Sequence, residues 1–216
     1  MSDHRPNPKA PLVLTRESSG AQFEGGTQLF IYTPDTENLF ATTVSAIDQL
    51  GLTIVDARII TSADGFTLDT YVVLDEQGTP IGEDWPRLDA IRNSLTEALS
   101  DPERFPDILQ RRMPRRHRHF NVPTQVVISN DIINDRTTVD IQTLDRPGLL
   151  ARIGQIFAEF NLLVQNARIA TLGERAEDVF FVTGRDGQPI SDPELCQRLQ
   201  KYIKEELDDL KEPGAA

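Results

Sequence analysis

The sequence predicts an α+β fold made of two copies of one unit, each an antiparallel sheet with helices on one face. Three observations predict it. The chain repeats itself at a shift of 110 residues, and both copies alternate β-rich and helical segments in the same order. The chain is also globular in composition, with 216 residues of which 38% are hydrophobic, enough for two small domains.

The repeat appears when residues 33–61 are placed over residues 143–171. Asp35 then falls on Asp145, and the triplet Ala-Arg-Ile recurs further along. After a one-residue gap, LDTYVVLDEQGTPI matches EDVFFVTGRDGQPI, which places Asp69 over Asp178. Matches this long, in one order and nearly one register, indicate a duplicated unit.

Each copy predicts the order strand, helix, strand, strand, helix. In the second copy, TTVDIQTL alternates as a half-buried strand does. A helix follows that ends at Asn161, and Gly51 has the same role in the first copy, because both residues tolerate a left-handed C-terminal conformation. Six apolar residues at helical spacing give this helix one buried stripe: Leu149, Leu150, Ile153, Ile156, Phe157 and Phe160.

Two further strands and a second helix complete the copy. LLVQNARIAT and EDVFFVTG are β-rich, and the segment LGERA between them suits a hairpin. Asp192 and Pro193 supply a capping side chain and a first-turn proline. The helix is expected to run to about Leu210, with Lys201 and Glu205 paired across one turn.

A sixth element would make each unit a ferredoxin-like βαββαβ domain. TQVVISND (124–131) is the expected last strand of the first copy, whereas the second copy has no chain left. Because an unpaired sheet edge is a liability, we expect the β-rich segment 11–15 to complete the second sheet. The predicted organisation is an N-terminal extension (1–26), a first domain (27–100 plus 124–131), a basic, proline-rich linker (101–123) and a second domain (136–210).

Charge and composition exclude several function classes. Lys and Arg number 22 against 34 Asp and Glu, and a net charge of −12 repels nucleic acid. No apolar run approaches the ~20 residues of a membrane helix, and no signal-peptide core is visible. We therefore expect no nucleic-acid partner, no membrane partner and a cytoplasmic location. A single cysteine, Cys196, offers neither a disulfide nor a cysteine metal site.

No segment carries a nucleophile motif, a phosphate-binding glycine-rich loop or a Cys/His metal spacing. We expect no catalytic residue, metal or cofactor within this chain. The linker holds the one basic cluster, which is interpreted either as a solvated linker or as a docking site for an acidic partner. Its members are Arg111, Arg112, Arg115, Arg116, His117, Arg118 and His119.

The most informative segment is LDRPGLL, the first strand–helix turn of the second copy. Asp145 can cap the helix, and Pro147 suits its first turn. Gly148 has no side chain, so a ligand can approach the backbone closely. The free N–H groups of the helix start attract a carboxylate, and Asp145 can receive an ammonium group. An ordinary capped turn is one interpretation, and a receptor for a free α-amino acid is the other.

The D-R-P-G-L-L turn, the βαββαβ order and the tandem copies resemble the ACT domain, a regulatory module that commonly binds amino acids. GGTQLFIYTPD, DARIITSADGFTLDTYVVLD, the basic linker ending in RHF, DRPGLLARIGQIFAEF and NARIATLGERAEDVFFVT extend the likeness. Together they resemble the C-terminal end of the bifunctional uridylyltransferase/uridylyl-removing enzymes, which modify the PII nitrogen-signalling proteins. The resemblance covers about residues 11–206.

The resemblance implies a regulatory region with glutamine as its effector. In that family, a nucleotidyltransferase domain uridylylates PII with UTP and a divalent metal, and an HD-type hydrolase domain removes the UMP. Neither motif set occurs in this sequence, so Mg²⁺ is expected only for the absent catalytic domains and PII proteins only as partners of a parent enzyme. ACT sheets often pair edge to edge, which implies a homodimer as one arrangement.

Transferred to this sequence, the resemblance implies a ligand site at the first turn of the second copy. Asp145 is expected to hold the ammonium group, and the Leu149 and Leu150 N–H groups the carboxylate. Either Gln165 or Asn166 is expected to face the cleft, because neighbouring strand residues point to opposite faces. The implied residues of this site are Thr143, Asp145, Arg146, Gly148, Leu149, Leu150, Gln165 and Asn166.

The first copy departs from this pattern. Thr36, Glu37 and Asn38 replace Arg146, Pro147 and Gly148, which removes the small residue and adds a negative charge. We expect the second site to bind more tightly than the first, or the first to bind nothing; the implied residues of the first site are Asp35, Asn38, Leu39 and Asp56. Two alternatives stay open: a free-standing ACT protein that binds another amino acid, and a protein-interaction module.

Overall fold

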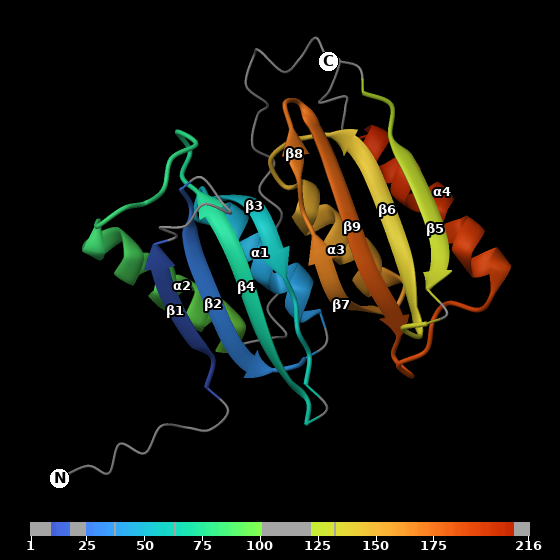
Figure 1. The fold of residues 1–216 in the computed structure, drawn as a ribbon, viewed down its shortest axis with the longest axis horizontal. Helices are drawn as coiled ribbons and strands as arrows, with labels where there is room; N and C mark the ends of the chain where they lie inside the picture. The colour runs from blue at the N-terminus through green and yellow to red at the C-terminus, as the bar shows by residue number, and fades with distance from the viewer. Residues whose placement is uncertain are drawn as a thin grey trace.

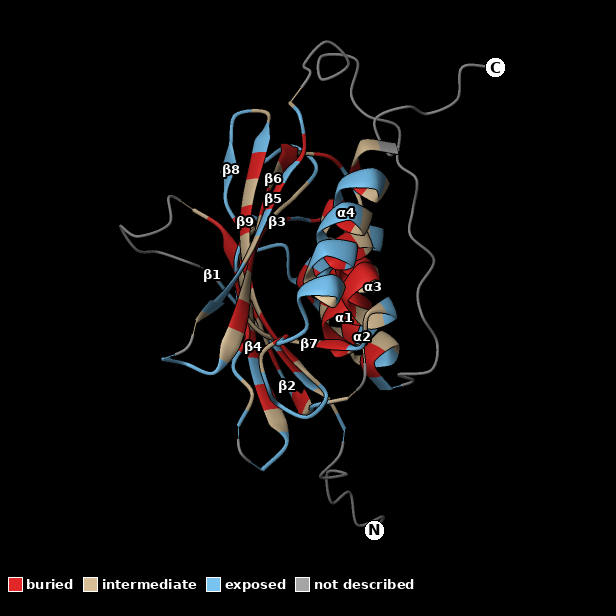
Figure 2. Ribbon diagram, turned by 90° about the vertical axis from the view of Figure 1, so that its right-hand side faces the viewer, coloured by how far each residue is buried: buried red, intermediate tan, exposed pale blue. Residues whose placement is uncertain are grey.

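The computed structural model describes residues 10–17, 25–36, 38–62, 64–100, 122–131 and 133–209. These residues form two layers, with the strands on one side and all the helices on the other (Figure 2). The strands form two separate sheets that stand side by side (Figure 1). Antiparallel sheets with helices on one face confirm the predicted ferredoxin-like fold class.

The first sheet has the strand order β1-β2-β4-β3, with antiparallel pairing throughout. Its elements are β1 (Leu12–Glu17), β2 (Thr27–Pro34), α1 (Leu39–Gln49), β3 (Thr53–Arg58), β4 (Phe66–Leu74) and α2 (Trp85–Ser100).

The second sheet repeats this arrangement as β5-β6-β9-β7, and the short strand β8 pairs with β9. Its elements are β5 (Gln125–Asp131), β6 (Arg136–Leu144), α3 (Leu149–Glu159), β7 (Leu162–Arg168), β8 (Thr171–Leu172), β9 (Arg175–Gly184) and α4 (Pro193–Asp209).

The two outer edge strands are exchanged relative to the sequence prediction. β1 pairs with β2, so Leu14 lies opposite Phe30, and β5 pairs with β6, so Ile128 lies opposite Val139. The expectations that residues 11–15 complete the second sheet and that residues 124–131 complete the first were wrong. Each edge strand directly precedes its own copy, and pairing neighbours in sequence closes a far shorter loop than pairing across the whole chain.

Local signals in the sequence end and start the helices as expected. Asn161 has a φ of 57° and Gly51 a φ of 77°, the left-handed conformation predicted after each first helix. At the start of α4, the Glu194 N–H donates to Asp192 Oδ1 at 2.9 Å. Lys201 Nζ lies 3.6 Å from Glu205 Oε1, which confirms the pair predicted across one helical turn.

The two copies pack through their first helices, α1 and α3, which lie side by side behind the centre of the sheets (Figure 1). Gly154 permits this approach, because a Cβ atom there would lie 2.8 Å from Ala41 Cα. The rings of Phe40 and Phe180, from different copies, meet edge to face with centroids 5.9 Å apart. The buried side chains of both copies therefore join in one core.

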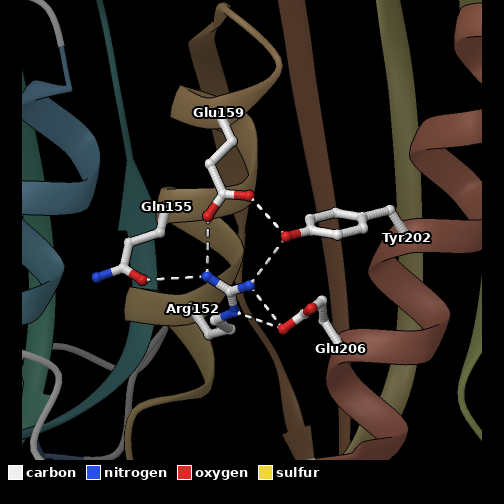
Figure 3. A network of polar contacts seen from close by, with 5 residues as sticks. All are labelled: Arg152, Gln155, Glu159, Tyr202 and Glu206. Atoms are coloured by element: carbon white, nitrogen blue, oxygen red, sulfur yellow. Dashed lines mark hydrogen bonds and ion pairs between the residues drawn. The ribbon is translucent and has the colours of Figure 1, made fainter.

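Arg152 fastens α3 to the last helix, α4 (Figure 3). Its Nη2 lies 2.6 Å from Glu206 Oε2, and its Nη1 lies 3.0 Å from Glu159 Oε1. The Tyr202 hydroxyl donates to the other oxygen of Glu159 at 2.8 Å. These contacts hold the C-terminal half of α4 against α3.

Three further expectations concern membrane helices, the single cysteine and the basic cluster. In the described part of the chain, no helix is long and apolar enough to cross a membrane. Cys196 is half-buried against the core of the second copy. The basic cluster between Arg111 and His119 lies outside the described residues, as does Glu37.

Candidate functional site

A pocket of about 180 Å³ lies where the two copies meet. The second copy supplies residues 145–151, at the turn before α3, together with Ile169, Thr171, Ala176 and Asp178. The first copy supplies the end of α1 and the start of β3: Val44, Asp48, Leu52, Thr53 and Ile54. We call this the large pocket. Neither copy alone could form it.

A second pocket, of about 30 Å³, is built from equivalent segments with the roles of the copies exchanged. The first copy supplies the turn before α1 with Ile59, Thr67 and Asp69, and the second copy supplies the end of α3 and residues 162–164. We call this the small pocket. The duplicated chain thus makes two related sites, and each is completed by a strand of the other copy.

The turn before α3 is shaped by Gly148, which is the N-cap residue and has a φ of 77°. The N-cap position of α3 is therefore held by Gly148, and Asp145 lies three residues before it. The Leu149 N–H donates to the Arg146 carbonyl at 3.2 Å. It is already hydrogen-bonded within the turn, whereas we expected it to bind a ligand carboxylate. Leu150 and Ala151 follow in the first helical turn, where N–H groups have no intrahelical acceptor.

Arg146 brings a buried cation to the large pocket. The residue is 8% exposed, and its Nη2 donates to the Leu207 carbonyl of α4. Its Nε and Nη1 are buried and find no hydrogen-bond partner among the described residues. Burial lowers the pKa of the guanidinium, and the nearby carboxylates of Asp208 and Asp145 oppose that effect. Unsatisfied N–H groups of a buried cation favour an anion.

Asp178 brings a buried carboxyl group to the same pocket. It is 1% exposed, and its Oδ1 accepts the Ala170 N–H at 3.4 Å. Its Oδ2 is buried and has no partner among the described residues. Burial raises the pKa of Asp178 to about 7; the Ala170 hydrogen bond lowers it, and the charges of Asp145 and Asp140 raise it further. Such a carboxyl group suits a ligand that brings a positive charge or N–H donors.

The structure brings many of the predicted residues together and sets others apart. Thr143 and Asp56 line neither pocket, and Thr143 instead lies within hydrogen-bonding distance of the Thr124 hydroxyl, at 2.8 Å. The large pocket is lined by Asp145, Arg146, Gly148, Leu149 and Leu150, and the small pocket by Asp35, Asn38 and Leu39.

The expected roles of Gln165 and Asn166 were wrong, since neither residue lines the large pocket. Gln165 Nε2 donates to the Thr183 hydroxyl at 3.1 Å instead. The reason is that β7 faces the small pocket, while the large pocket receives Thr53 and Ile54 of β3. The prediction assumed a cleft within one copy, whereas the pocket lies between two.

Asp178 is the functional candidate that sequence reasoning missed. Its signal was present, because Ala176, Asp178, Phe180 and Val182 alternate along β9 and all are buried on the same face. A carboxylate in such a row, repeated at Asp69, marks a buried acid. In the described part of the chain, no group of three or more His, Cys, Asp or Glu side chains could hold a metal ion.

Comparisons with known proteins give one matching family model and several similar proteins. Residues 132–209 match the family model described as the ACR family N-terminal ACT domain. The chain is 56% identical over 210 residues to the bifunctional uridylyltransferase/uridylyl-removing enzyme of Pseudomonas fluorescens (strain SBW25), which covers 97% of this chain. It is 58% identical to the enzyme of the same name from Pseudomonas putida (strain W619), over 94% of this chain.

The chain spans 23% of the length of each of these relatives. Among solved structures, an aspartate kinase from Synechocystis matches 85% of this chain and 27% of its own, at 15% identity and a TM-score of 0.47.

Proposed function

We propose that this chain, which is homologous to the C-terminal region of bifunctional uridylyltransferase/uridylyl-removing enzymes, is an amino-acid-sensing regulatory region of such an enzyme. Its effector is glutamine, and it controls the attachment and removal of uridylyl groups on PII proteins. The observation that carries the proposal is the large pocket, whose lining includes Arg146 and Asp178, two buried residues with side-chain atoms that have no hydrogen-bond partner among the described residues.

A free α-amino acid is a zwitterion, so its receptor needs an anion site beside a cation site. Arg146 and the first turn of α3 supply the anion site, since a guanidinium and a helix N-terminus both stabilise a carboxylate. Asp178 and Asp145, which line the same pocket, supply the cation site. This pairing favours amino acids over ligands with only one charge.

The size of the large pocket agrees with such a ligand. A water molecule needs about 10–15 Å³ by this measure, so about 180 Å³ leaves room for a small organic molecule. Thr53 and Thr171 are exposed at the rim and could hydrogen-bond a carboxamide side chain. A sensor of an abundant metabolite works near 1 mM, which corresponds to a binding free energy of only about −4 kcal/mol.

Regulation follows from the position of the pocket between the two copies. A ligand that contacts the turn before α3 and the start of β3 stabilises one relative arrangement of the copies. It shifts that equilibrium only by its differential affinity for the two arrangements. In a full-length enzyme, this shift would determine which catalytic domain acts.

Isothermal titration calorimetry of the 216-residue chain against each of the twenty L-amino acids tests the proposal. We expect glutamine to bind in the millimolar range and the others to bind at least tenfold more weakly. Tighter binding of another amino acid would identify a sensor of that metabolite instead. If none of the twenty binds, the sensor proposal is wrong.

A further inference from the structure

We infer that ligand binding is confined to the large pocket, where the Asp178 carboxylate receives the ammonium group of the amino acid, and that the small pocket is closed from within by side chains that already satisfy Asp69. This inference rests on the proposed function, because it assigns a specificity-determining residue to the same site. It also makes the two copies unequal despite their common descent.

The duplication placed one buried acid in each copy. Asp69 on β4 and Asp178 on β9 are equivalent in the repeat, and each is 1% exposed. Asp69 lines the small pocket and Asp178 the large pocket. A buried carboxylate is expensive unless hydrogen bonds compensate it, so the partners of each acid are informative.

Asp69 finds its partners within its own strand. The Thr67 hydroxyl donates to Asp69 Oδ1, and the Tyr71 hydroxyl donates to Oδ2 at 3.4 Å. Both oxygens are therefore occupied by protein donors. Nothing in this arrangement calls for a ligand.

Asp178 lacks both of these partners. The residues equivalent to Thr67 and Tyr71 are Ala176 and Phe180, which have no hydroxyl group. The Ala170 N–H reaches Oδ1, and Oδ2 is left buried without a donor among the described residues. A buried acceptor without a partner destabilises the unliganded chain, and the ammonium group of a ligand would supply the missing donor.

Two further differences point the same way. The missing Thr side chain at Ala176 accompanies a pocket of about 180 Å³ rather than 30 Å³. Arg146 lines the large pocket, whereas Thr36 has its place in the small one, and no Lys or Arg of the described residues lines that pocket. The small pocket thus lacks the open volume, the unpaired acid and the cation that a zwitterion requires.

A matched pair of substitutions tests the assignment by calorimetry with L-glutamine. Asp178→Asn keeps the shape and removes the charge, and we expect glutamine binding to weaken at least tenfold. Asp69→Asn makes the same change in the small pocket and should leave both affinity and stoichiometry, one ligand per chain, unchanged. Circular dichroism and thermal unfolding confirm that both variants are folded.

An analogue separates the ammonium group from the carboxamide. Glutaramate is glutamine without its α-amino group, so it cannot use Asp178 as an ammonium receptor. We expect Asp178→Asn to leave the weak binding of glutaramate unchanged. An equal loss for both ligands would show that Asp178 contacts the carboxamide, and it would overturn the assignment.

A second substitution recreates the closed pocket. Ala176→Thr introduces the hydroxyl that Thr67 supplies to Asp69, and we expect it to weaken glutamine binding at least tenfold. Ala176→Val has the same shape without the hydroxyl, and it should weaken binding less. If Asp178→Asn and Ala176→Thr both leave glutamine binding unchanged, this inference fails while the proposed function stands. If the wild-type chain binds none of the twenty amino acids, both fail.

Discussion

Arg146 and Asp178 are buried, and each has side-chain atoms without a hydrogen-bond partner among the described residues. Both residues line the large pocket. The first copy differs at both places, because Thr36 stands where the second copy has Arg146, and hydroxyl groups donate to the acid equivalent to Asp178. Such groups cost stability in the unliganded chain. Binding sites commonly retain costs of this kind, because a ligand recovers them.

Replacing Arg146 with Met should separate binding from stability. The variant removes a buried cation whose Nε and Nη1 have no partner among the described residues, so we expect the free energy of unfolding to stay within about 1 kcal/mol of the wild type or to rise. Glutamine affinity should fall at least tenfold, because the carboxylate loses its cation. Urea unfolding and calorimetry measure the two effects, and a large loss of stability with unchanged affinity would contradict this role.

The pH dependence of stability should report the buried acid. Burial raises the pKa of Asp178 from 3.8 to about 7, and the charges of Asp145 and Asp140 add to the shift. The cationic residue that lines the same pocket is Arg146. The folded chain then holds a proton that the unfolded chain releases. Stability from this group is therefore fully present below pH 3.8 and is lost as pH rises towards 7, by about 1.4 kcal/mol per pH unit.

Urea unfolding at pH 5 and pH 7 checks this effect. The wild type should lose stability relative to Asp178→Asn between the two values, because the amide does not titrate. Asp69→Asn gives a matched comparison, since burial also raises the pKa of Asp69 to about 7. The wild type should therefore lose stability relative to Asp69→Asn over the same pH range. Parallel pH profiles for the wild type and Asp178→Asn would contradict a raised pKa.

At the level of elements, the contact between α1 and α3 holds the pockets in place. Gly154 lets the helices approach, and both Val44 and Gly154 line a pocket. Gly154→Ala should destabilise the chain by about 1–3 kcal/mol, because the new Cβ would lie 2.8 Å from Ala41 Cα and force the helices apart. Helix propensity alone predicts the opposite, a gain of about 1 kcal/mol. Thermal and urea unfolding decide between the two.

The edge strands provide a second test at this level. β1 pairs with β2, so removal of residues 1–17 should expose the edge of the first sheet and destabilise the first copy. Hydrogen exchange should then accelerate in β2 and β4 and remain slow in β6 and β9. Faster exchange confined to the second sheet would support the pairing that the sequence alone predicted.

The elements show why sequence reasoning succeeded in part. Caps such as Asp192 and left-handed residues such as Asn161 act through their nearest neighbours, so they were predictable. The position of β1 depends on which of two sheet edges it joins, and both edges offer similar hydrogen bonds. The rule that sequential strands pair would have given the observed answer.

For the whole molecule, the duplication is the main organising feature. The sequence repeat predicted two similar units and pointed to the turn at Asp145, which does line the large pocket. It could not predict that β3 of one copy completes the pocket of the other, because that depends on how α1 and α3 pack. Residues such as Thr53 and Ile54 therefore have no motif of their own.

An NMR titration of the labelled 216-residue chain with L-glutamine tests most directly that an amino acid binds between the two copies. We predict that the amide signals of residues 148–151 and of Thr53 and Ile54 shift together along one binding curve, while those of residues 38–41 and 162–164 respond weakly. If the signals of residues 148–151 stay unmoved at saturating glutamine, or move without those of Thr53 and Ile54, the proposed site between the copies is contradicted.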